Sequence, residues 1–554
     1  MEMSAATYGS LDPTNLGNFM NPLRLSGEDG LLGFLDASDV PVSLVAREER
    51  VGVLPGKETR TLLYRAEQDG RVLLNPILVT KKGAGFSAEL VNGLTEEETT
   101  IHWHGLHLDW RADGHPSRQV GPGAAYRYEF PVLNAGGTYW YHPHAHENTA
   151  RQTYLGLAGF FLVRDEEERR LNEALGLEFG KTDVPLVIQD KTFAEDGSLD
   201  YEPSEMDRSM GVTGDTILVN LMSTPFLEAE NRSYRFRLLN ASNARILRLA
   251  FARPNEGEPL VYHVVATDGS LLDRPRAVEE LYLAPGERVD VLLDLTGFEP
   301  GEEVTLKSLA FDPMHREHEM CESTNHGPGH AVTHGAHHDT GYEGHAGRGD
   351  PGGGAGMGGM EHAGASRLGD GQEFYVLRLV VKETAGRAGR RPTPGVPDVL
   401  SEVPEPDLGR ASARRVTLSV ETEGDETRWL IDGRTYNPNE YPIVTRRGEV
   451  EVWEIRNEER SMPHPMHLHA FRFRVLGRTG SPEQVSHLAV DRQGRTVTDL
   501  GWKDTVLVWP GETVRIAIDF SHGFEGEQLY LFHCHILEHE DSGMMVNVKV
   551  VDEA

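Results

Sequence analysis

The stretch LYLFHCHILEHEDSGMM, residues 529–545, places Cys534, one of only two cysteines in the chain, between two histidines. His539 lies five residues after this cysteine, and Met544 lies ten residues after it. Thiolate, imidazole and thioether groups suit copper, and this spacing offers all three from one loop. The stretch therefore predicts a metal site near the end of the chain.

Histidines gather in four short clusters along the sequence. The clusters hold ten of the 25 histidines: HWH with His102 and His104, HPH with His142 and His144, HPMHLH with His464, His467 and His469, and HCH with His533 and His535, followed by His539. Alternate side chains of a strand share one face, so each H-x-H pair can turn two imidazoles towards one site. For one such pair an ordinary surface or core position is the better interpretation, but four pairs favour metal binding. Eight imidazoles from four strands could surround three metal ions.

The cysteine site needs a second imidazole from elsewhere in the chain. His464 is the histidine of HPMHLH that is left once His467 and His469 form an H-x-H pair. Two histidines, one cysteine and a weak axial methionine are the ligands of blue-copper electron-transfer sites. Zinc could use similar ligands, but structural zinc sites rarely include methionine and would not explain the flanking histidines. His533 and His535 face away from Cys534, so the sequence links an electron-transfer site to the predicted cluster.

Length and charge limit the class of protein. A chain of 554 residues is expected to form two or three domains. Lys and Arg total 54 and Asp and Glu total 87, a net charge of −33 that disfavours nucleic-acid binding. No apolar run of about 18 residues occurs, so we expect a soluble chain without a membrane span. We also expect a monomer. The first thirty residues do not resemble a signal peptide, and we expect any such peptide to be absent from this sequence.

Short segments rich in Val, Leu, Tyr and Thr alternate with turns of Gly, Pro, Asn and Asp, as at 137–142 and 261–272. This pattern predicts an all-β fold of β-sandwiches. A helix is expected over 165–177, and the proline-rich segment 384–407 cannot sustain strand pairing. The predicted division is an N-terminal arm with a first domain over 1–165, a second domain over 178–385, a linker over 386–408 and a third domain over 409–554.

Residues 314–362 differ from the rest of the chain in composition. They are rich in His, Gly and Met and almost lack aliphatic residues, so we expect a flexible insertion in the second domain, ahead of a strand at 374–381. Two interpretations stay open, a solvated loop or a low-affinity collector of metal ions. Met320 and Cys321 within it could bind Cu(I) or be exposed bystanders.

The four clusters, in this order, resemble the multicopper oxidases, and the chain looks like a bacterial three-domain member related to laccases. Several stretches are similar to cuprous oxidases of copper resistance and to spore-coat laccases: GTYWYHPHAH, GLAGFFLVRD, VPLVIQDKTF, GWKDTV and HCHILEHEDSGMM. The similarity spans roughly residues 45–165, 180–310 and 410–550. The resemblance implies three cupredoxin-like Greek-key domains, with a type 1 copper in the third and a trinuclear cluster between the first and the third.

The resemblance also implies four copper ions, one of type 1, one of type 2 and two of type 3. Carried over by position, the ligands are His464, Cys534, His539 and axial Met544 for type 1, His102 and His467 for type 2, and His104, His142, His144, His469, His533 and His535 for the type 3 pair. Four one-electron oxidations at type 1 would then supply the reduction of dioxygen to two waters. Asp113 and Glu540 match positions that relay protons in similar enzymes, whereas their ordinary interpretations are a turn aspartate and a solvated glutamate.

Substrate choice is the point at which the sequence departs from cuprous oxidases. Met462 matches a substrate-side methionine of that group, but Arg460 stands where an acid is expected. The insertion at 314–362 is His/Gly-rich and comes earlier than the Met-rich insertion of those enzymes. We expect a laccase-like oxidase of phenols and aromatic amines, with Cu(I) or metal-ion oxidation as the alternative.

Two further alternatives are a copper-sequestering protein and, less favoured, a copper nitrite reductase, whose chains are shorter and do not need the paired clusters. Family resemblance suggests a periplasmic, secreted or cell-surface location.

Overall fold

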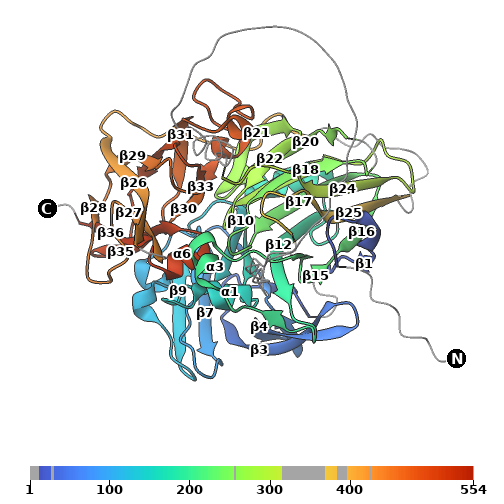
Figure 1. The fold of residues 1–554 in the computed structure, drawn as a ribbon, viewed down its shortest axis with the longest axis horizontal. Helices are drawn as coiled ribbons and strands as arrows, with labels where there is room; N and C mark the ends of the chain where they lie inside the picture. Colours follow the sequence, from blue (N-terminus) through green and yellow to red (C-terminus); the bar gives the residue numbers. More distant parts are fainter. Residues whose placement is uncertain are drawn as a thin grey trace, which may run out of the picture.

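The computed structural model describes residues 11–25, 30–254, 257–314, 368–383, 396–423 and 426–552. Within these ranges six β-sheets pack face to face in three pairs, each around its own apolar core. Figure 1 shows the first pair in blue at the bottom, the second in green at the upper right and the third in orange and red at the upper left. The predicted all-β class is confirmed.

The first pair consists of two five-stranded sheets. One sheet has the order β5 (Arg71–Leu74), β4 (Lys57–Gln68), β3 (Val42–Leu54), β7 (Gly85–Asn92) and β9 (Ala125–Pro131). The other has the order β2 (Phe34–Asp36), β6 (Ile77–Lys81), β11 (Gly159–Arg164), β10 (Gly137–His142) and β8 (His102–His104). Burial alternates along β7, which is the pattern of a strand with one face on the core. Strand β8 lies at the edge of its sheet, so its side chains can meet another part of the protein.

The second pair consists of a seven-stranded and an eight-stranded sheet. The first follows β1 (Asn21–Pro22), β16 (Pro225–Glu230), β25 (Phe374–Lys382), β24 (Glu303–Ser308), β18 (Leu247–Ala252) and β19 (Pro259–Leu260), with β22 (Glu280–Leu283) beside β18. The second follows β15 (Met222–Ser223), β14 (Thr216–Val219), β12 (Asp183–Phe193), β17 (Ser233–Asn240), β23 (Arg288–Asp294), β20 (Tyr262–Thr267) and β21 (Ser270–Val278), with β13 (Leu199–Asp200) beside β12. Because β1 pairs with β16, the N-terminal arm contributes a strand to the second pair.

The third pair consists of a six-stranded and a five-stranded sheet. The first follows β27 (Glu426–Ile431), β26 (Ser412–Glu423), β29 (Val450–Asn457), β34 (Thr513–Asp519), β31 (Phe473–Thr479) and β32 (Trp502–Lys503). The second follows β28 (Ile443–Arg446), β36 (Met545–Val551), β35 (Gln528–Cys534), β30 (His464–Leu468) and β33 (Thr505–Val508).

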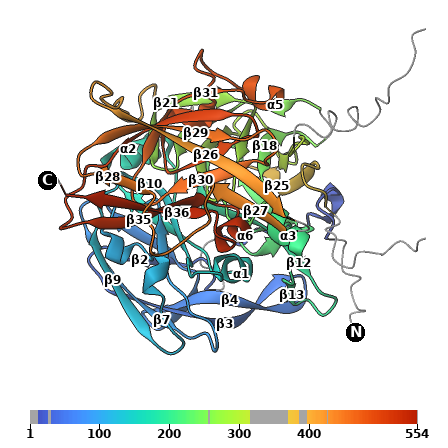
Figure 2. The ribbon, with the colours of Figure 1, turned by 60° about the vertical axis from the view of Figure 1, so that its left-hand side comes forward.

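Helices are short and occupy the connections. The α-helices are α1 (Thr149–Tyr154), α2 (Glu166–Leu175), α3 (Glu205–Met210), α5 (Glu483–Ser486) and α6 (Leu537–Asp541), and the 3₁₀ turns are η1 (Leu16–Asn18), η2 (Trp110–Ala112), η3 (Pro116–Arg118) and η4 (Val497–Leu500). Helix α2 confirms the helix expected over 165–177, since Asp165 caps its start and Gly176, at φ 62°, ends it. Helices α1 and α3 both contact α6 near the centre of the molecule (Figures 1 and 2).

The predicted insertion joins two neighbouring strands. Strands β24 and β25 pair with each other, and the chain between them contains residues 314–362. Apart from Met314, which packs against the core of the third pair, this segment lies outside the described residues. Met320 and Cys321 therefore lie outside them too, and so does the first part of the linker expected over 386–408. The proposed domain limits stay predictions.

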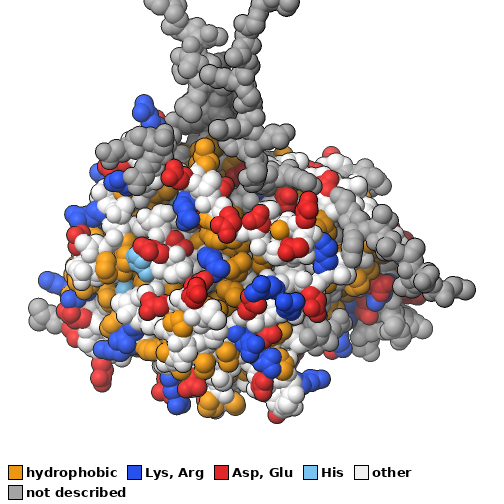
Figure 3. All heavy atoms as spheres, turned by 60° about the horizontal axis from the view of Figure 1, so that its bottom comes forward, with side chains coloured by type: hydrophobic (Ala, Val, Ile, Leu, Met, Phe, Trp, Pro, Cys, Tyr) orange, Lys and Arg blue, Asp and Glu red, His pale blue; other side chains and the backbone are white. Residues whose placement is uncertain are grey.

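Acidic and basic side chains are interspersed over the face shown in Figure 3, with apolar side chains between them. No helix in the described ranges is long and apolar enough to cross a membrane.

Replacement of Trp453 tests the core of the third pair. Its side chain is fully buried, and its ring meets Phe532 of the opposite sheet edge-on with 5.2 Å between centroids. We expect Trp453→Ala to lower the free energy of unfolding by about 3–5 kcal/mol, because the ring leaves a cavity between the sheets. The midpoint of thermal unfolding measures this. Val444→Ala, on an edge strand and 47% exposed, is the control and should barely shift it; equal midpoints for both variants would contradict the packing.

Candidate metal centre

One pair of adjacent strands, β30 and β35, carries two sites on its two faces. Met466 is the cross-strand partner of Cys534, and His467 is the partner of His533. Partners in an antiparallel pair share a face, and successive residues alternate between faces. His464 therefore shares the face of Met466 and Cys534, which is the core of the third pair, while His467 and His533 occupy the opposite face.

The sulfur of Cys534 is surrounded by two imidazoles. His464 Nδ1 lies 3.4 Å from Cys534 Sγ, and His539 Nδ1 lies 3.6 Å from it. Nitrogen and sulfur ligands that share one metal ion at bond lengths of ~2.0 and ~2.3 Å stand about 3.6 Å apart. All three side chains are fully buried. The structure thus brings together three of the four residues predicted at this site in a spacing that fits one ion.

Met544, the fourth predicted residue, is fully buried in the same core. Its carbonyl oxygen accepts a hydrogen bond from the Cys534 amide at 3.0 Å, and its own amide donates to His539 O at 2.8 Å. These bonds close the loop that contains α6 and return Met544 to the cysteine. The loop between residues 534 and 544 is therefore a compact unit.

The far ring nitrogens of the two imidazoles are held by protein groups. His464 Nε2 lies 2.9 Å from Ser461 Oγ, and His539 Nε2 lies 2.8 Å from Ser209 O. The indole nitrogen of Trp429 donates to the same carbonyl at 2.7 Å. Helix α3, which contains Ser209, therefore covers the outer edge of His539.

The second site lies where the edge strand β8 of the first pair meets β30 and β35 of the third. His102 Nε2 lies 3.3 Å from His467 Nε2, and His144 Nε2 lies 3.4 Å from His533 Nε2. His469 Nε2 approaches His533 Nε2 to 3.0 Å. Two imidazole nitrogens bound to one ion at ~2.0–2.1 Å stand about 3.3 Å apart, so these contacts have the spacing of shared metal ligands.

The structure brings all eight predicted cluster histidines together. Their ring nitrogens form three groups in which every ligand atom lies within 4.8 Å of the others, and the first two groups share His104: His102, His104 and His467; His104, His142 and His535; and His144, His469 and His533. Each histidine is at most 1% exposed. The cluster is therefore a closed chamber of imidazoles between two sheet pairs.

The chemistry of the donor set fits bound metal ions. His104 Nδ1, His142 Nε2 and both ring nitrogens of His535 are buried without a hydrogen-bond partner in the described part of the chain. Burial also lowers the pKa of His104, His142 and His535 well below the usual value, with neighbouring histidines adding to the effect. Neutral imidazoles with free lone pairs cost free energy when buried, and metal ions would satisfy them.

Asp113 lies directly behind the cluster. The 3₁₀ turn η2 delivers it, and its Oδ2 is 2.6 Å from His469 Nδ1 while its backbone oxygen is 2.9 Å from His102 Nδ1. Gly114, at φ 80°, follows it, and a Cβ there would lie only 2.1 Å from Ile101 O. Asp113 does lie in a turn, as its ordinary interpretation has it, but its side chain is fully buried against the cluster.

Glu540 stands behind the other end of the cluster. Its Oε1 lies 3.3 Å from His144 Nδ1, and its Oε2 lies 3.3 Å from His533 Nδ1. The side chain is 1% exposed, so the interpretation as a solvated glutamate is wrong. Burial, followed by the neighbouring Asp541, raises the pKa of Glu540 well above its usual value. Both predicted acids touch the cluster histidines.

Three further residues were missed by sequence reasoning. Asp504 Oδ1 lies 2.9 Å from His104 Nε2, Trp140 stacks on His142 at 4.2 Å between centroids, and Trp429 packs on both imidazoles of the sulfur site. Asp504 belongs to GWKDTV and Trp140 to GTYWYHPHAH, so both lay within stretches already singled out. Trp429 had no comparable signal because its strand β27 is distant from the cysteine in sequence.

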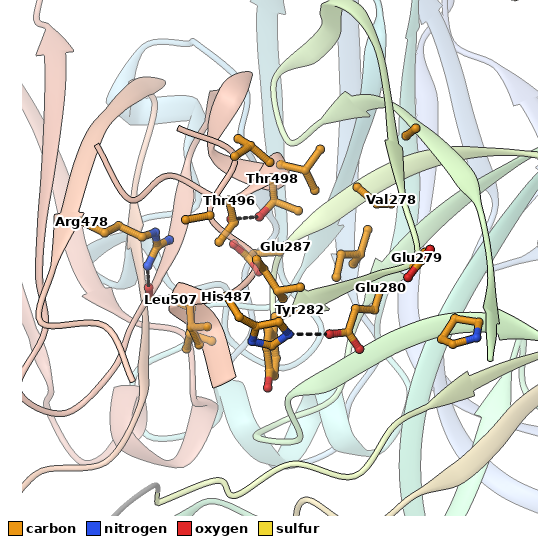
Figure 4. Close-up of a pocket in the computed structure, with 18 of the residues that line it drawn as sticks. Val278, Glu279, Glu280, Tyr282, Glu287, Arg478, His487, Thr496, Thr498 and Leu507 are labelled. Atoms are coloured by element: carbon orange, nitrogen blue, oxygen red, sulfur yellow. Dashed lines mark hydrogen bonds and ion pairs between the residues drawn. The ribbon is translucent and has the colours of Figure 1, made fainter. Parts of the chain in front are cut away.

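A cavity of about 770 Å³ lies between the second and third pairs, and none of the predicted metal ligands lines it. Figure 4 shows its wall, where His487 Nε2 and Glu280 Oε1 are 3.0 Å apart beside Tyr282 and Glu287. The rest of the lining is largely apolar, as at Val261 and Val490.

Comparison with known proteins gives a consistent result. Two family models described as multicopper oxidase match residues 66–168 and 410–554. Those ranges contain all twelve predicted ligands.

Similar proteins extend the match to most of the chain. The multicopper oxidase mco of Staphylococcus epidermidis is 28% identical, over 92% of this chain and 88% of that protein. A laccase of Bacillus subtilis is 30% identical, over 82% of this chain and 80% of its own length. The crystal structure of the McoA multicopper oxidase from the hyperthermophile Aquifex aeolicus has a TM-score of 0.77 and 35% identity, covering 96% of this chain and 99% of that one.

Copper binding at the sulfur site should depend on pH. Burial raises the pKa of the Cys534 thiol, so the copper-free protein keeps this thiol protonated at neutral pH. Burial lowers the pKa of His539 to about 3 and that of His464 well below its usual value, so both imidazoles are already neutral. Binding therefore releases one thiol proton, and we expect affinity to rise about tenfold for each unit of pH above 6.

Chelator competition at several pH values measures this affinity, and Cys534→Ser is the control because it has no thiol proton to release. An affinity at the sulfur site that does not change with pH would contradict the protonated thiol.

Proposed function

Because the chain belongs to the multicopper oxidase family, and is a copper-dependent oxidoreductase, we propose that it is a laccase-like oxidase of phenols and aromatic amines that reduces dioxygen to water. The observation that carries the proposal is the position of Cys534. Its side chain faces one site, while its neighbours His533 and His535 face the other. The likeness to a laccase supports phenols as the class of reductant.

We propose four copper ions, with the ligands assigned by the family pattern. His464, Cys534, His539 and Met544 would hold type 1, His102 and His467 would hold type 2, and the remaining six histidines would hold the type 3 pair. Two of the observed groups, His104 with His142 and His535, and His144 with His469 and His533, divide those six into two sets of three. When bound, copper supplies one-electron transfer at the sulfur site and the reduction of dioxygen at the cluster.

The chain offers two short connections from sulfur to cluster. One runs through the backbone from Cys534 to His533 or His535. The other crosses a hydrogen bond, since His533 Nδ1 lies 3.0 Å from Cys534 O. Four one-electron oxidations supply the four electrons that reduction of one dioxygen needs. Either connection would carry these electrons one at a time from the sulfur site to the cluster.

Asp113 and Glu540 are proposed to carry protons to the cluster. Four protons accompany the four electrons when dioxygen becomes two waters. Asp113 reaches the Nδ1 side of His469, and Glu540 reaches the Nδ1 side of His144 and His533. Each Glu540 oxygen faces one of these imidazole nitrogens, and burial raises the pKa of the carboxyl group, so the group can hold a proton beside the cluster.

Oxidation of Cu(I) is the second candidate, and helix α3 favours it. The helix covers the outer edge of His539, which leaves less room for a bulky donor. It also presents Met206 and Met210, 70% and 37% exposed, whose thioethers suit Cu(I). Against this candidate, Met462 is buried in the core and Arg460 is an exposed cation.

A copper store is less favoured than an oxidase, because all twelve ligand positions of the pattern are filled and buried. We further propose that the protein acts as a monomer outside the cytoplasm, at the cell surface, in the periplasm or after secretion, on the strength of the family resemblance.

Steady-state oxygen uptake with a phenol, an aromatic amine and Cu(I), measured side by side on the copper-loaded protein, tests the substrate class. We expect the organic donors to sustain turnover at a higher kcat/KM than Cu(I). The double variant Met206→Leu, Met210→Leu removes the exposed thioethers and should leave phenol turnover unchanged. A selective fall in Cu(I) oxidation in that variant, or after deletion of residues 315–362, would instead support the metal-ion oxidase.

Glu540→Gln tests the proton carrier. We expect oxygen uptake to fall about 10²-fold with copper content unchanged, because the amide cannot shuttle a proton. Glu538→Gln is the matched control: Glu538 is buried on the same helix, but it is held by Asn243 and the Val212 amide. Unchanged turnover in Glu540→Gln with all copper bound would remove this role.

A further inference from the structure

Asp504 stands at the junction of all three sheet pairs. Its Oδ1 lies 2.9 Å from His104 Nε2 of the first pair, and its backbone oxygen lies 2.9 Å from His467 Nδ1 of the third. Arg288 of the second pair donates to both of its carboxylate oxygens, at 2.8 and 2.6 Å. One aspartate, immediately before β33, therefore contacts two cluster histidines and a buried arginine of the second pair.

His104 is oriented differently from the other cluster histidines. Six of them turn Nε2 into the cluster and place Nδ1 against a protein acceptor, as His102, His142 and His533 do with backbone oxygens. His104 instead has Nε2 at Asp504 and Nδ1 buried without a partner in the described residues, and it belongs to the group of potential ligands that contains His142 and His535. Since a carboxylate only accepts, it fixes the proton on Nε2 and leaves the Nδ1 lone pair free.

Asp504 is itself held rigidly by the second pair. Arg288 is fully buried and uses its remaining N–H groups on the backbone oxygens of Thr138, Gly286 and Asp268. Lys503 joins Asp268 and Glu287 at 3.0 Å each, and Glu287 reaches the wall of the cavity in Figure 4. A bidentate arginine and a fully paired network prevent the carboxylate from rotating away from His104.

The backbone beside His104 is shaped for this contact. Gly105 has φ 85°, and a Cβ there would lie 2.5 Å from Asp504 Oδ2 and 2.8 Å from Arg288 Nη2. Only glycine permits both the left-handed turn and the close approach of the carboxylate. The close approach at Gly105 and the orientation of His104 are separate observations, and both involve Asp504.

We propose that Asp504, clamped by Arg288, is the positioning residue that selects the Nε2–H form of His104 and so directs Nδ1 at one copper of the type 3 pair. By this route the second sheet pair, which contributes none of the twelve ligands, controls assembly of the cluster. The inference rests on the proposed function in assigning His104 to type 3. Carboxylates that orient a metal-bound histidine typically change metal affinity 10–100-fold when removed.

The copper-free protein gives the first test. Nitrogen NMR of its histidine side chains reports which ring nitrogen holds the proton, without any bound metal. We expect the Nε2–H form for His104, and the Nδ1–H form for His102. A His104 protonated at Nδ1 in the wild-type protein would overturn the proposal whatever the variants do.

The second test uses Asp504→Asn, whose amide cannot accept at both oxygen positions. We expect about 10–100-fold weaker copper binding at the type 3 pair, seen as loss of its spin-coupled signature, with the blue type 1 absorption retained. Arg288→Lys keeps the charge but not the bidentate clamp, and should show a smaller loss of the same kind.

Asp499→Asn is the matched control, because Asp499 is a buried carboxylate that forms a bidentate pair with Arg478 and contacts no cluster histidine. If Asp504→Asn keeps wild-type affinity at the type 3 pair, or loses type 1 and type 3 in the same proportion as Asp499→Asn, Asp504 is merely structural. A wild-type protein that binds no coupled pair would refute the proposed function instead, while the NMR result would still decide the role of Asp504.

Discussion

The alternation of side chains along one antiparallel strand pair is the constraint on which both metal centres depend. Because Cys534 and His533 are adjacent on β35, the sulfur lies in the core of the third pair and the imidazole lies outside it. Strand β30 repeats the arrangement with His464 and His467. A shift of one residue in the register would exchange the faces and destroy both sites at once. The separation of the two centres is thus fixed by backbone geometry.

Burial gives these centres their chemistry. The imidazoles of His104 and His535 are neutral because desolvation lowers their pKa, and their unpaired nitrogens are unfavourable without metal. Asp113 and Glu540, the two acids behind the cluster, are buried as well, and burial of a carboxyl group costs desolvation free energy that an exposed position avoids. Such groups destabilise a copper-free chain, so copper binding and folding are expected to be coupled in this protein.

Contacts between sheet pairs, rather than the pairs alone, complete the cluster. Strand β8 is an edge strand whose histidines meet those of β30 only when the first and third pairs are docked. The second pair contributes Arg288, a buried cation that is stable only because Asp504 and several carbonyl oxygens surround it. The polar character of these contacts fixes one relative arrangement of the pairs, since any other would leave charges unpaired.

Much of the protein was determined by sequence. The H-x-H spacing and the Cys534 to Met544 loop specify local geometry, because strand periodicity and short loops act over a few residues. The all-β class, the helix at 166–175 and all twelve candidate ligands followed from such local patterns. The resemblance to multicopper oxidases supplied the division of those ligands among copper ions.

Tertiary structure decided which residues surround and contact the ligand histidines. Asp504 contacts His104, which lies 400 positions away in the sequence. Trp429 and Ser209 contact His539 from 110 and 330 positions away. No local pattern encodes such contacts: Asp504 and Ser209 meet their histidines only when separate sandwiches dock, and Trp429 meets His539 only when the two sheets of the third pair pack together. The same reason explains why the burial of Asp113 and Glu540 was left open by sequence: a turn residue and a helix residue become interior only when another sheet pair covers them.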